Sequence, residues 1–377
     1  MTRTARRGLA AALALALGAA ATAAAQSPQP FGSIDFVEGN ASVTRGNRLL
    51  GDANIGDDVY PDDLIRTAGD GVVVIALARS TGMRGTLTVR PRSVAYLRLA
   101  PGDGGPRGGI ELIAGQIASK MTKITGNPSF TVTTETAVMG VRGTAFGVAA
   151  SVNGGILITC SEGEVEARDG QSRVAVPAGN AAERKPAERL RVIPIRLSSS
   201  EDFERRWIAE EIEAFKADPA RALGDLVERY TELNRRFAEA MDPVQRSEVL
   251  NTWLREDAAG QTPRSNDPAV MRQKREIVPL ILEARKILFI FERIYYRLDQ
   301  IEGLVLGTPA ERAMIRPGLT AGDFLRRFRQ EAPVLERRML LFRQAERLYA
   351  LRNQGGAGFS GLGGSDDFFG SDGDWDF

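Results

Sequence analysis

The stretch "TETAVMGVRGTAFGV", residues 134–148, decides how the first half of this chain is interpreted. Its apolar and β-branched residues are typical of a strand, but Gly140, Gly143 and Gly147 interrupt them, and Arg142 stands between the first two. Glycines allow a strand to bend or to approach another backbone closely. The stretch therefore predicts a bent strand with a charged residue at the corner.

Arg142 has two interpretations. Burying an unpaired guanidinium is very costly, so we expect Arg142 to bond to backbone carbonyls or to a carboxylate such as Glu162. The alternative is an arginine that anchors a ligand. The first role would make this stretch a structural corner, and the second would make it a binding site.

Short β-branched runs alternate with glycine turns from residue 31 to about residue 196. Phe130 and Val132 share one face of such a run, as residues two apart do in a strand. Asp169-Gly170 lies between two runs and is a hairpin signal. The pattern predicts an all-β domain over residues 26–196. Its strands are predicted at residues 71–78, 86–90, 93–99, 110–118, 129–134, 144–152, 154–160, 163–168 and 172–176.

The order of motifs in this region resembles the FecR domain family of bacterial envelope proteins. The resemblance covers about residues 35–180 and implies an exported β domain with a solenoid-like or roll-like organisation. The matching positions are Asp63, Ile65 and Thr67, then Val141, Arg142, Gly143, Thr144, Phe146 and Val148, then Glu162, Gly163 and Val165, and finally Ala178 and Gly179.

The chain also departs from the family pattern. Glu135 stands where the family typically has the proline of a Thr-Pro turn. Full FecR regulators have a cytoplasmic anti-sigma segment and one membrane span before the periplasmic domain, and this chain begins instead with a cleavable type of signal. The resemblance therefore implies the β domain without implying control of a sigma factor.

The N-terminal residues 1–25 predict a secretory signal peptide. Arg3, Arg6 and Arg7 precede an Ala/Leu run that ends in small residues, so we expect cleavage after Ala25. The mature protein is then periplasmic or secreted and has no transmembrane span. The alternative is an uncleaved membrane anchor.

Residues 197–353 predict an α-helical domain, a small antiparallel bundle. A serine cap and early acids open the first helix near residue 200. Further helices are expected at about residues 219–240, 243–255, 269–301 and 321–353, with Pro279 kinking or restarting the fourth. The fold class is α+β and multidomain.

Residues 354–377 are rich in Gly and Asp, contain aromatic residues and lack Lys and Arg, so this tail is expected to be disordered when free. Its aromatic side chains, Phe368, Phe369, Trp375 and Phe377, are candidate anchors for docking to a partner. The alternative is a terminus that only increases solubility.

Composition limits the chemistry. The chain has no histidine, which removes the commonest general base and transition-metal ligand. The single cysteine, Cys160, is expected to be a buried side chain, and no intramolecular disulfide is possible. A net charge of +1 gives no indication of nucleic-acid binding. We predict no catalytic residue, no cofactor and no metal.

The carboxylate pairs and the basic runs each have a structural and a functional interpretation. Carboxylate pairs, which a glycosidase needs, are more simply explained as solvated turns. Basic runs in the helical region predict charged outer faces, or alternatively a face for an anionic polymer or an acidic partner. The carboxylate pairs are Asp57-Asp58, Asp62-Asp63, Glu162 with Glu164, and Asp366-Asp367, and the basic runs are at 233–237, 324–330 and 335–348.

These observations favour a non-enzymatic exported envelope protein that acts through protein–protein or protein–glycan contacts. The first alternative is a FecR-type signalling regulator that keeps its N-terminal anchor. The second is a carbohydrate-active enzyme that uses carboxylates alone.

Overall fold

The computed structural model describes residues 29–46, 48–100, 105–123, 129–141, 143–186, 188–195, 199–261 and 267–353. Within these residues the sheet-rich part comes first in the chain and five α-helices follow it. The predicted signal peptide, Arg142 and the tail at residues 354–377 lie outside the described residues.

The strands form two layers that share one long strand, β9. The first layer has the order β4 (Asp58–Val59), β1 (Gly32–Glu38), β6 (Val72–Leu77), β7 (Met83–Val89), β9 (Arg107–Lys123), β12 (Ala145–Ala150), β13 (Ile156–Glu162), β16 (Asn180–Arg184) and β17 (Arg191–Pro194). All neighbouring strands in this layer are antiparallel.

The second layer has the order β3 (Arg48–Asp52), β2 (Ala41–Arg45), β5 (Asp63–Thr67), β8 (Val94–Ala100), β9, β10 (Ser129–Thr133), β11 (Val138–Val141), β14 (Glu164–Arg168) and β15 (Arg173–Pro177). Of these pairs, β9 with β10 is parallel and the others are antiparallel.

β9 changes layers at Gly115. Its first half pairs with β8 and β10, and the residues from Gly115 onward pair with β7 and β12. Gly115 has φ +88°, and a Cβ there would lie 2.4 Å from the carbonyl oxygen of Arg92. A side chain would therefore meet both an unfavourable backbone conformation and a clash.

Alternation along the strands gives each layer an inner and an outer face. On β8, Ala95 and Leu97 belong to the core between the layers, whereas Val94 and Tyr96 belong to the core shared with the helices. Strands buried on both faces explain why these segments read as nearly continuous apolar runs.

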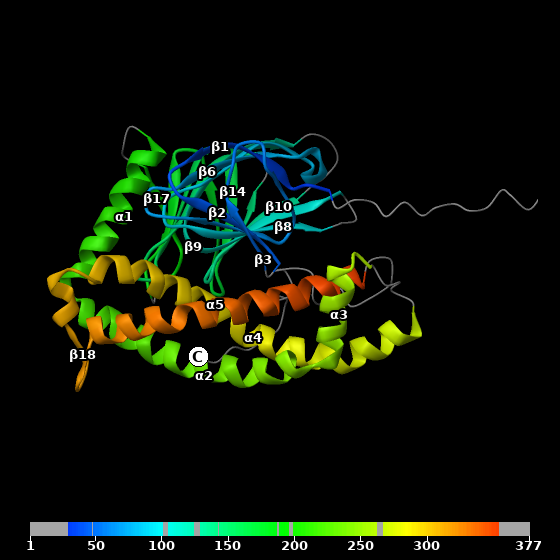
Figure 1. Cartoon of the computed structure of the whole chain (residues 1–377). Coiled ribbons are helices and arrows are strands. Elements are labelled where there is room, and N and C mark those ends of the chain that lie inside the picture. Colours follow the sequence, from blue (N-terminus) through cyan, green and yellow to red (C-terminus); the bar gives the residue numbers. More distant parts are fainter. Residues whose placement is uncertain are drawn as a thin grey trace, which may run out of the picture.

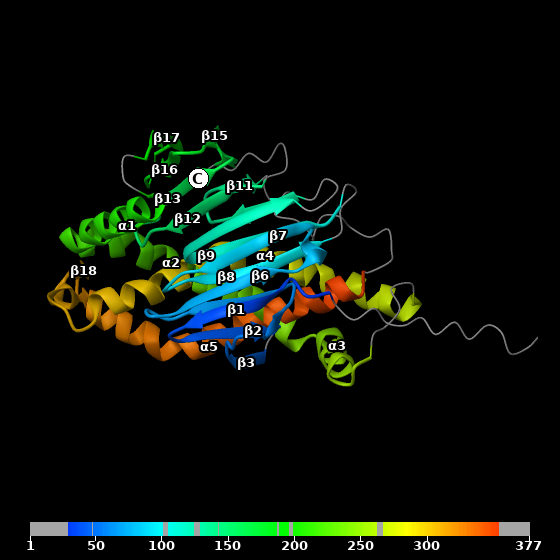
Figure 2. The same cartoon turned by 90° about the horizontal axis from the view of Figure 1, so that it is seen from above.

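The helices cover both layers (Figure 1). They are α1 (Ser200–Ala217), α2 (Pro219–Arg246), α3 (Glu248–Ala258), α4 (Pro268–Val305) and α5 (Ala321–Leu351). Helices α2, α4 and α5 pack against one another below the second layer, with α4 against β9, and α1 lies against β12 and β13 of the first layer (Figures 1 and 2).

Short elements complete the described chain. Between α4 and α5 are a 3₁₀ turn, η2 (Pro309–Arg312), and a hairpin of β18 (Met314–Arg316) with β19 (Leu319–Thr320). A further 3₁₀ turn, η1 (Arg79–Thr81), precedes β7.

The prediction that the third helix starts at Pro243 was wrong, and so was a restart of the fourth helix at Pro279. Pro243 does not start the third helix but lies inside α2, where it is exposed, so the carbonyl that loses its helical partner can bond to water. Ser247 starts α3 instead, and its hydroxyl accepts a hydrogen bond from the Leu250 N–H at 3.3 Å. Pro279 does not interrupt α4, which is continuous through it.

The three glycines of residues 134–148 differ in backbone conformation and surroundings. Gly143 has φ +63°, a left-handed conformation that favours glycine. A Cβ at Gly147 would lie 2.0 Å from Glu204 Oε1 of α1, so this glycine allows the helix to approach the sheet. Gly140 needs neither property, because nothing lies within 4 Å of its Cβ position. The bend predicted from all three glycines therefore depends on Gly143.

Candidate functional site at the sheet–helix boundary

A cluster of polar and ionised side chains lies where the second layer meets α4 and α5. We name it the ionic seam. Its members are Tyr96 and Arg98 of β8, Glu111 of β9, Glu292 and Arg293 of α4, and Arg343 of α5.

Glu111 is the acceptor at the centre of the seam. It is 9% exposed. Arg98 Nη2 lies 2.5 Å from its Oε2 atom, and Arg293 Nη2 lies 3.0 Å from its Oε1 atom. Arg343 Nη2 is 3.6 Å from the same Oε1. This single carboxylate of the sheet therefore contacts arginines from a neighbouring strand and from two helices.

Glu292 is a second buried acceptor, fully enclosed on α4. It receives a hydrogen bond from Arg343 Nη2 and another, of 3.0 Å, from the Tyr96 hydroxyl. The Arg343 guanidinium also lies over the Tyr96 ring, 4.5 Å from its centroid. Charge-assisted bonds and a cation–π contact therefore converge on one arginine.

The electrostatics of the seam follow from burial and pairing. Burial alone would raise the pKa of Glu111, but Arg343, Arg98 and Arg293 hold that pKa well below its ordinary value. Burial raises the pKa of Tyr96 well above its usual range. The Glu111 carboxylate is therefore held ionised, and the Tyr96 phenol stays neutral and donates a hydrogen bond to Glu292.

Further ion pairs extend the boundary on either side of the seam. Arg66 of β5 binds Asp299 of α4 at 2.9 Å and Glu336 of α5 at 2.8 Å. The Gln300 amide donates to the Arg92 carbonyl at 2.6 Å. The boundary is thus polar along much of its length.

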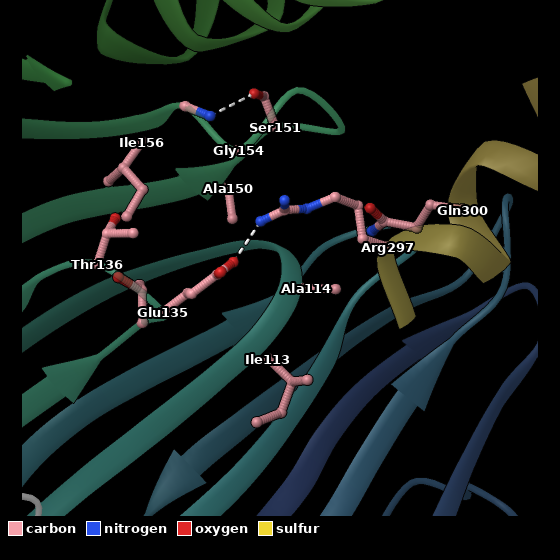
Figure 3. A pocket seen from close by; sticks show the side chains of 12 residues that line it. Ile113, Ala114, Glu135, Thr136, Ala150, Ser151, Gly154, Ile156, Arg297 and Gln300 are labelled. Atoms are coloured by element: carbon pink, nitrogen blue, oxygen red, sulfur yellow. Dashed lines mark hydrogen bonds and ion pairs between the residues drawn. The ribbon is translucent and has the colours of Figure 1, made fainter. Parts of the chain in front are cut away.

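Glu135 lies in the turn between β10 and β11 and binds the helices. It accepts a hydrogen bond from Arg297 of α4 (Figure 3). Arg229 of α2 lies 3.9 Å away. Burial would raise the pKa of Glu135, but Arg297 and Arg229 lower it. The residue that departs from the family's proline is therefore a contact between the sheet and two helices.

The hollow beside this pair is small. It is lined by Glu135, Arg297, Ser151, Gly154 and other residues shown in Figure 3, and its volume is about 20 Å³. That is room for about one water molecule. A cavity that encloses an organic ligand is usually larger by more than tenfold, at roughly 300 Å³ or more.

α1 has its own polar contact with the first layer. Glu204 is 3% exposed and accepts a hydrogen bond from the Thr159 hydroxyl, with Arg90 Nη2 at 3.5 Å. Burial raises the pKa of Glu204, against the opposing effects of Thr159 and Arg90. Nearby, the indole of Trp207 donates to Glu183 at 2.8 Å.

The predicted signature residues are partly described. Val141, Thr144 and Phe146 are buried, and Phe146 belongs to the core between the layers. Gly163, at φ +80°, makes the turn between β13 and β14. Arg142 lies outside the described residues, and so do the candidate docking residues Phe368, Phe369, Trp375 and Phe377.

Glu162, the suggested partner of Arg142, is paired with another residue. It binds Lys120 at 2.7 Å, and both side chains are mostly exposed. The expectation for Cys160 is confirmed, since its side chain is fully buried, and burial raises the pKa of its thiol. The thiol is therefore held in its unreactive protonated form.

Several of the carboxylate pairs and basic runs form contacts with neighbours. Asp62 and Asp63 bind Arg98 and Arg45 respectively. The pair Asp366-Asp367 lies outside the described residues. In the basic runs, many arginines bind acids of this chain: Arg235 binds Glu232 and Glu239, Arg326 binds Glu311, Arg329 binds Glu302, and Arg347 binds Asp257.

Within the ranges that the structure describes, no cluster of His, Cys, Asp or Glu could hold a metal ion. None of the described helices is both long and apolar enough to span a bilayer.

The seam residues were not predicted as a site. A signal was present in "FIFERIYYRL", residues 289–298, where Glu292 and Arg293 interrupt an apolar run. The run from Phe291 to Tyr296 is buried on every side of the helix. Charged side chains on a helix that is buried on all sides need partners on neighbouring elements. Glu292 and Arg293 can therefore be recognised as residues that bind another element.

Comparisons with known proteins give one family match. The model of the FecR protein family matches residues 63–166, from β5 into β14. No curated protein matches the chain.

Two solved structures are similar to part of the chain, each described as a candidate anti-sigma factor from Parabacteroides distasonis. One is 15% identical, with a TM-score of 0.30, and the match covers 35% of this chain and 59% of that one. The other is 16% identical, with a TM-score of 0.23, and the match covers 34% and 53%. The chain thus spans somewhat more than half the length of these structures.

Proposed function

We propose that this chain, which carries a FecR domain over residues 63–166, is an exported, non-enzymatic protein of the bacterial cell envelope. In this proposal it acts by binding a protein or a glycan. The signal-like residues 1–25 support export. The solenoid-like organisation that the family resemblance implies stays a prediction.

The ionic seam is the observation that carries the proposal. Its most strongly perturbed groups are Glu111, Tyr96 and Arg343. Arg343 of the helical layer lies 3.6 Å from Glu111 and over the ring of Tyr96, and the Tyr96 hydroxyl donates to Glu292. Perturbed pKa values mark either functional chemistry or structural ion-pair networks. Here each group has a partner within the protein, which favours a structural network and a scaffold that presents its outer surface to a partner.

N-terminal sequencing tests the export part of this proposal. Protein purified from a periplasmic extract is expected to begin at Gln26. A membrane-bound product that begins at Met1 would overturn export with cleavage and would favour the anchored FecR-type regulator.

Incubation with purified cell-wall glycan tests the non-enzymatic part. We expect no new reducing ends, and we expect photo-crosslinking in the native envelope to yield an adduct with a protein or a glycan. Glycan turnover that disappears with one Asp→Asn or Glu→Gln substitution would contradict the proposal and support the carboxylate-based hydrolase.

A further inference from the structure

The strand β3 is an open, apolar edge of the second layer. Among the described residues it pairs only with β2. Leu49 is 63% exposed and Leu50 is 46% exposed, and Arg48 beside them is exposed too. An edge strand presents unpaired N–H and C=O groups, and proteins usually protect such an edge by covering or charging it. Two adjacent exposed leucines leave this edge suited to accept another strand.

The two leucines place adjacent apolar surface on the edge. The pairing register of β2 with β3 shifts between Val43 and Thr44, so Leu50 is the extra residue of an irregularity in β3. A segment that pairs with β3 would therefore need two adjacent apolar residues, one for each leucine, and an acid to meet Arg48.

The described end of α5 lies near this edge. The turn after β2 lies against α5, because a Cβ at Gly46 would be 1.9 Å from Gln344 Oε1. From Gln344 to Asn353 the distance along a helix axis is about 14 Å. Arg352 fixes this end of α5 on α3, since it binds Glu256 at 2.6 Å and lies over the Trp253 ring. The views of Figures 1 and 2 both place β3 beside α5.

The sequence after Asn353 contains the required residues within reach. It continues as "QGGAGFSGLGGSDDFFGSDGDWDF", with Asp366-Asp367 directly before Phe368-Phe369 and no Lys or Arg. The chain from Asn353 to Phe368 can span up to about 50 Å. A Gly-rich sequence before the aspartates leaves the connection unrestricted in direction.

We propose that the segment Asp366–Phe369 of the same chain adds to the free edge of β3, with its two phenylalanines beside Leu49 and Leu50 and its aspartates near Arg48. Strand addition supplies backbone hydrogen bonds, and contacts between the phenylalanines and the leucines set the register of the segment relative to β3. An external partner of this edge would then have to displace the tail.

Hydrogen exchange at residues 48–52 tests the proposal on the full chain. We expect these amides to exchange about tenfold faster in the double variant Phe368→Ser, Phe369→Ser than in the unchanged chain. The control variant Phe359→Ser also removes a tail phenylalanine and is expected to leave exchange unchanged. Equal exchange in all three proteins would overturn the proposal.

Disulfide trapping separates binding within one chain from binding between copies. Cys160 is fully buried, so the thiols introduced by Leu50→Cys and Phe369→Cys are the reactive pair. Mild oxidation of this double variant is expected to give a monomer in which the two introduced thiols are linked, and peptide mapping identifies the link. A covalent dimer would show that the tail binds a second copy, and absence of any link would show that it does not bind this edge. Either result overturns the proposal.

Discussion

Arg297 of α4 donates a hydrogen bond to Glu135 in the turn between β10 and β11, so one residue of the FecR-like part binds a helix outside it. The same carboxylate lies 3.9 Å from Arg229 of α2. The family pattern has a proline at this turn, which could make neither contact. The departure at Glu135 therefore fits a chain whose sheet carries its own helical layer.

Removing the Glu135 charge should weaken this connection. Glu135→Gln leaves Arg297, whose side chain is 16% exposed, without its carboxylate. We expect the free energy of unfolding to fall by about 1.5–3 kcal/mol, the range for a hydrogen bond to a charged group. Urea unfolding measures the change. The control Glu162→Gln breaks an exposed pair with Lys120, and a loss there as large as for Glu135 would contradict this account.

Arg343 should matter more than an exposed arginine of α5. Arg343→Met removes the arginine that binds the fully buried Glu292, and it takes a cation away from Glu111. Breaking a buried pair on one side costs about 3–5 kcal/mol. The matched control Arg337→Met lies on the exposed face of the same helix and should change stability by at most about 0.5 kcal/mol. Equal effects in urea unfolding would refute the structural role of the seam.

Glu204 should make stability fall as pH rises. Its pKa is raised in the folded protein, chiefly by burial, so the folded state binds this proton more tightly than the unfolded state. The stabilisation is fully present below about pH 4.5 and is lost as pH rises through the raised folded pKa. Glu204→Gln imitates the protonated form. The free energy of unfolding of this variant, relative to that of the unchanged protein, should therefore increase as pH rises from about 4.5 towards neutral.

The groups that face Glu204 are Thr159, Arg90 and Glu201, so the control for this experiment is Glu201→Gln. Glu201 has a side chain that is 68% exposed, and its substitution should change stability by at most about 0.5 kcal/mol. Thermal melting at several pH values measures both variants. A Glu204→Gln effect that is constant with pH would show that this carboxylate does not titrate as described.

Two glycines should respond very differently to alanine. Gly115→Ala places a Cβ in a positive-φ residue 2.4 Å from a backbone oxygen and should cost about 2 kcal/mol or more. Gly140→Ala meets open space and should change stability by at most about 0.5 kcal/mol. Chemical denaturation of both variants compares them, and similar losses would argue against the layer change at Gly115.

Much of the fold could be predicted because burial of one face of a strand or helix leaves a local pattern of apolar residues in the sequence. The apolar alternation around Phe130 and Val132 predicted the strand β10, and the Asp169-Gly170 turn predicted the β14–β15 hairpin. The strands β1 to β5 were not predicted individually. Their runs are short and carry several charged or exposed residues, as the exposed β3 illustrates.

The packing of the helices on the sheet could not be predicted. Helical periodicity places Arg293 and Arg343 on helices, but their shared partner Glu111 lies 182 residues from Arg293 in the chain. No local spacing connects residues so far apart. The helical spacing of Phe291, Ile294 and Leu298 indicated only that one face of α4 is apolar and faces a core.

We expect the ionic seam to join the sheet and the helical layer into one cooperative unit. Native-state hydrogen exchange of β9 and α4 tests it most directly, in the unchanged protein and in Arg343→Met. We predict that the slowest amides of both elements open with the same free energy, and that the substitution lowers both by the same amount. Faster exchange confined to α4, with β9 unchanged, would contradict this expectation.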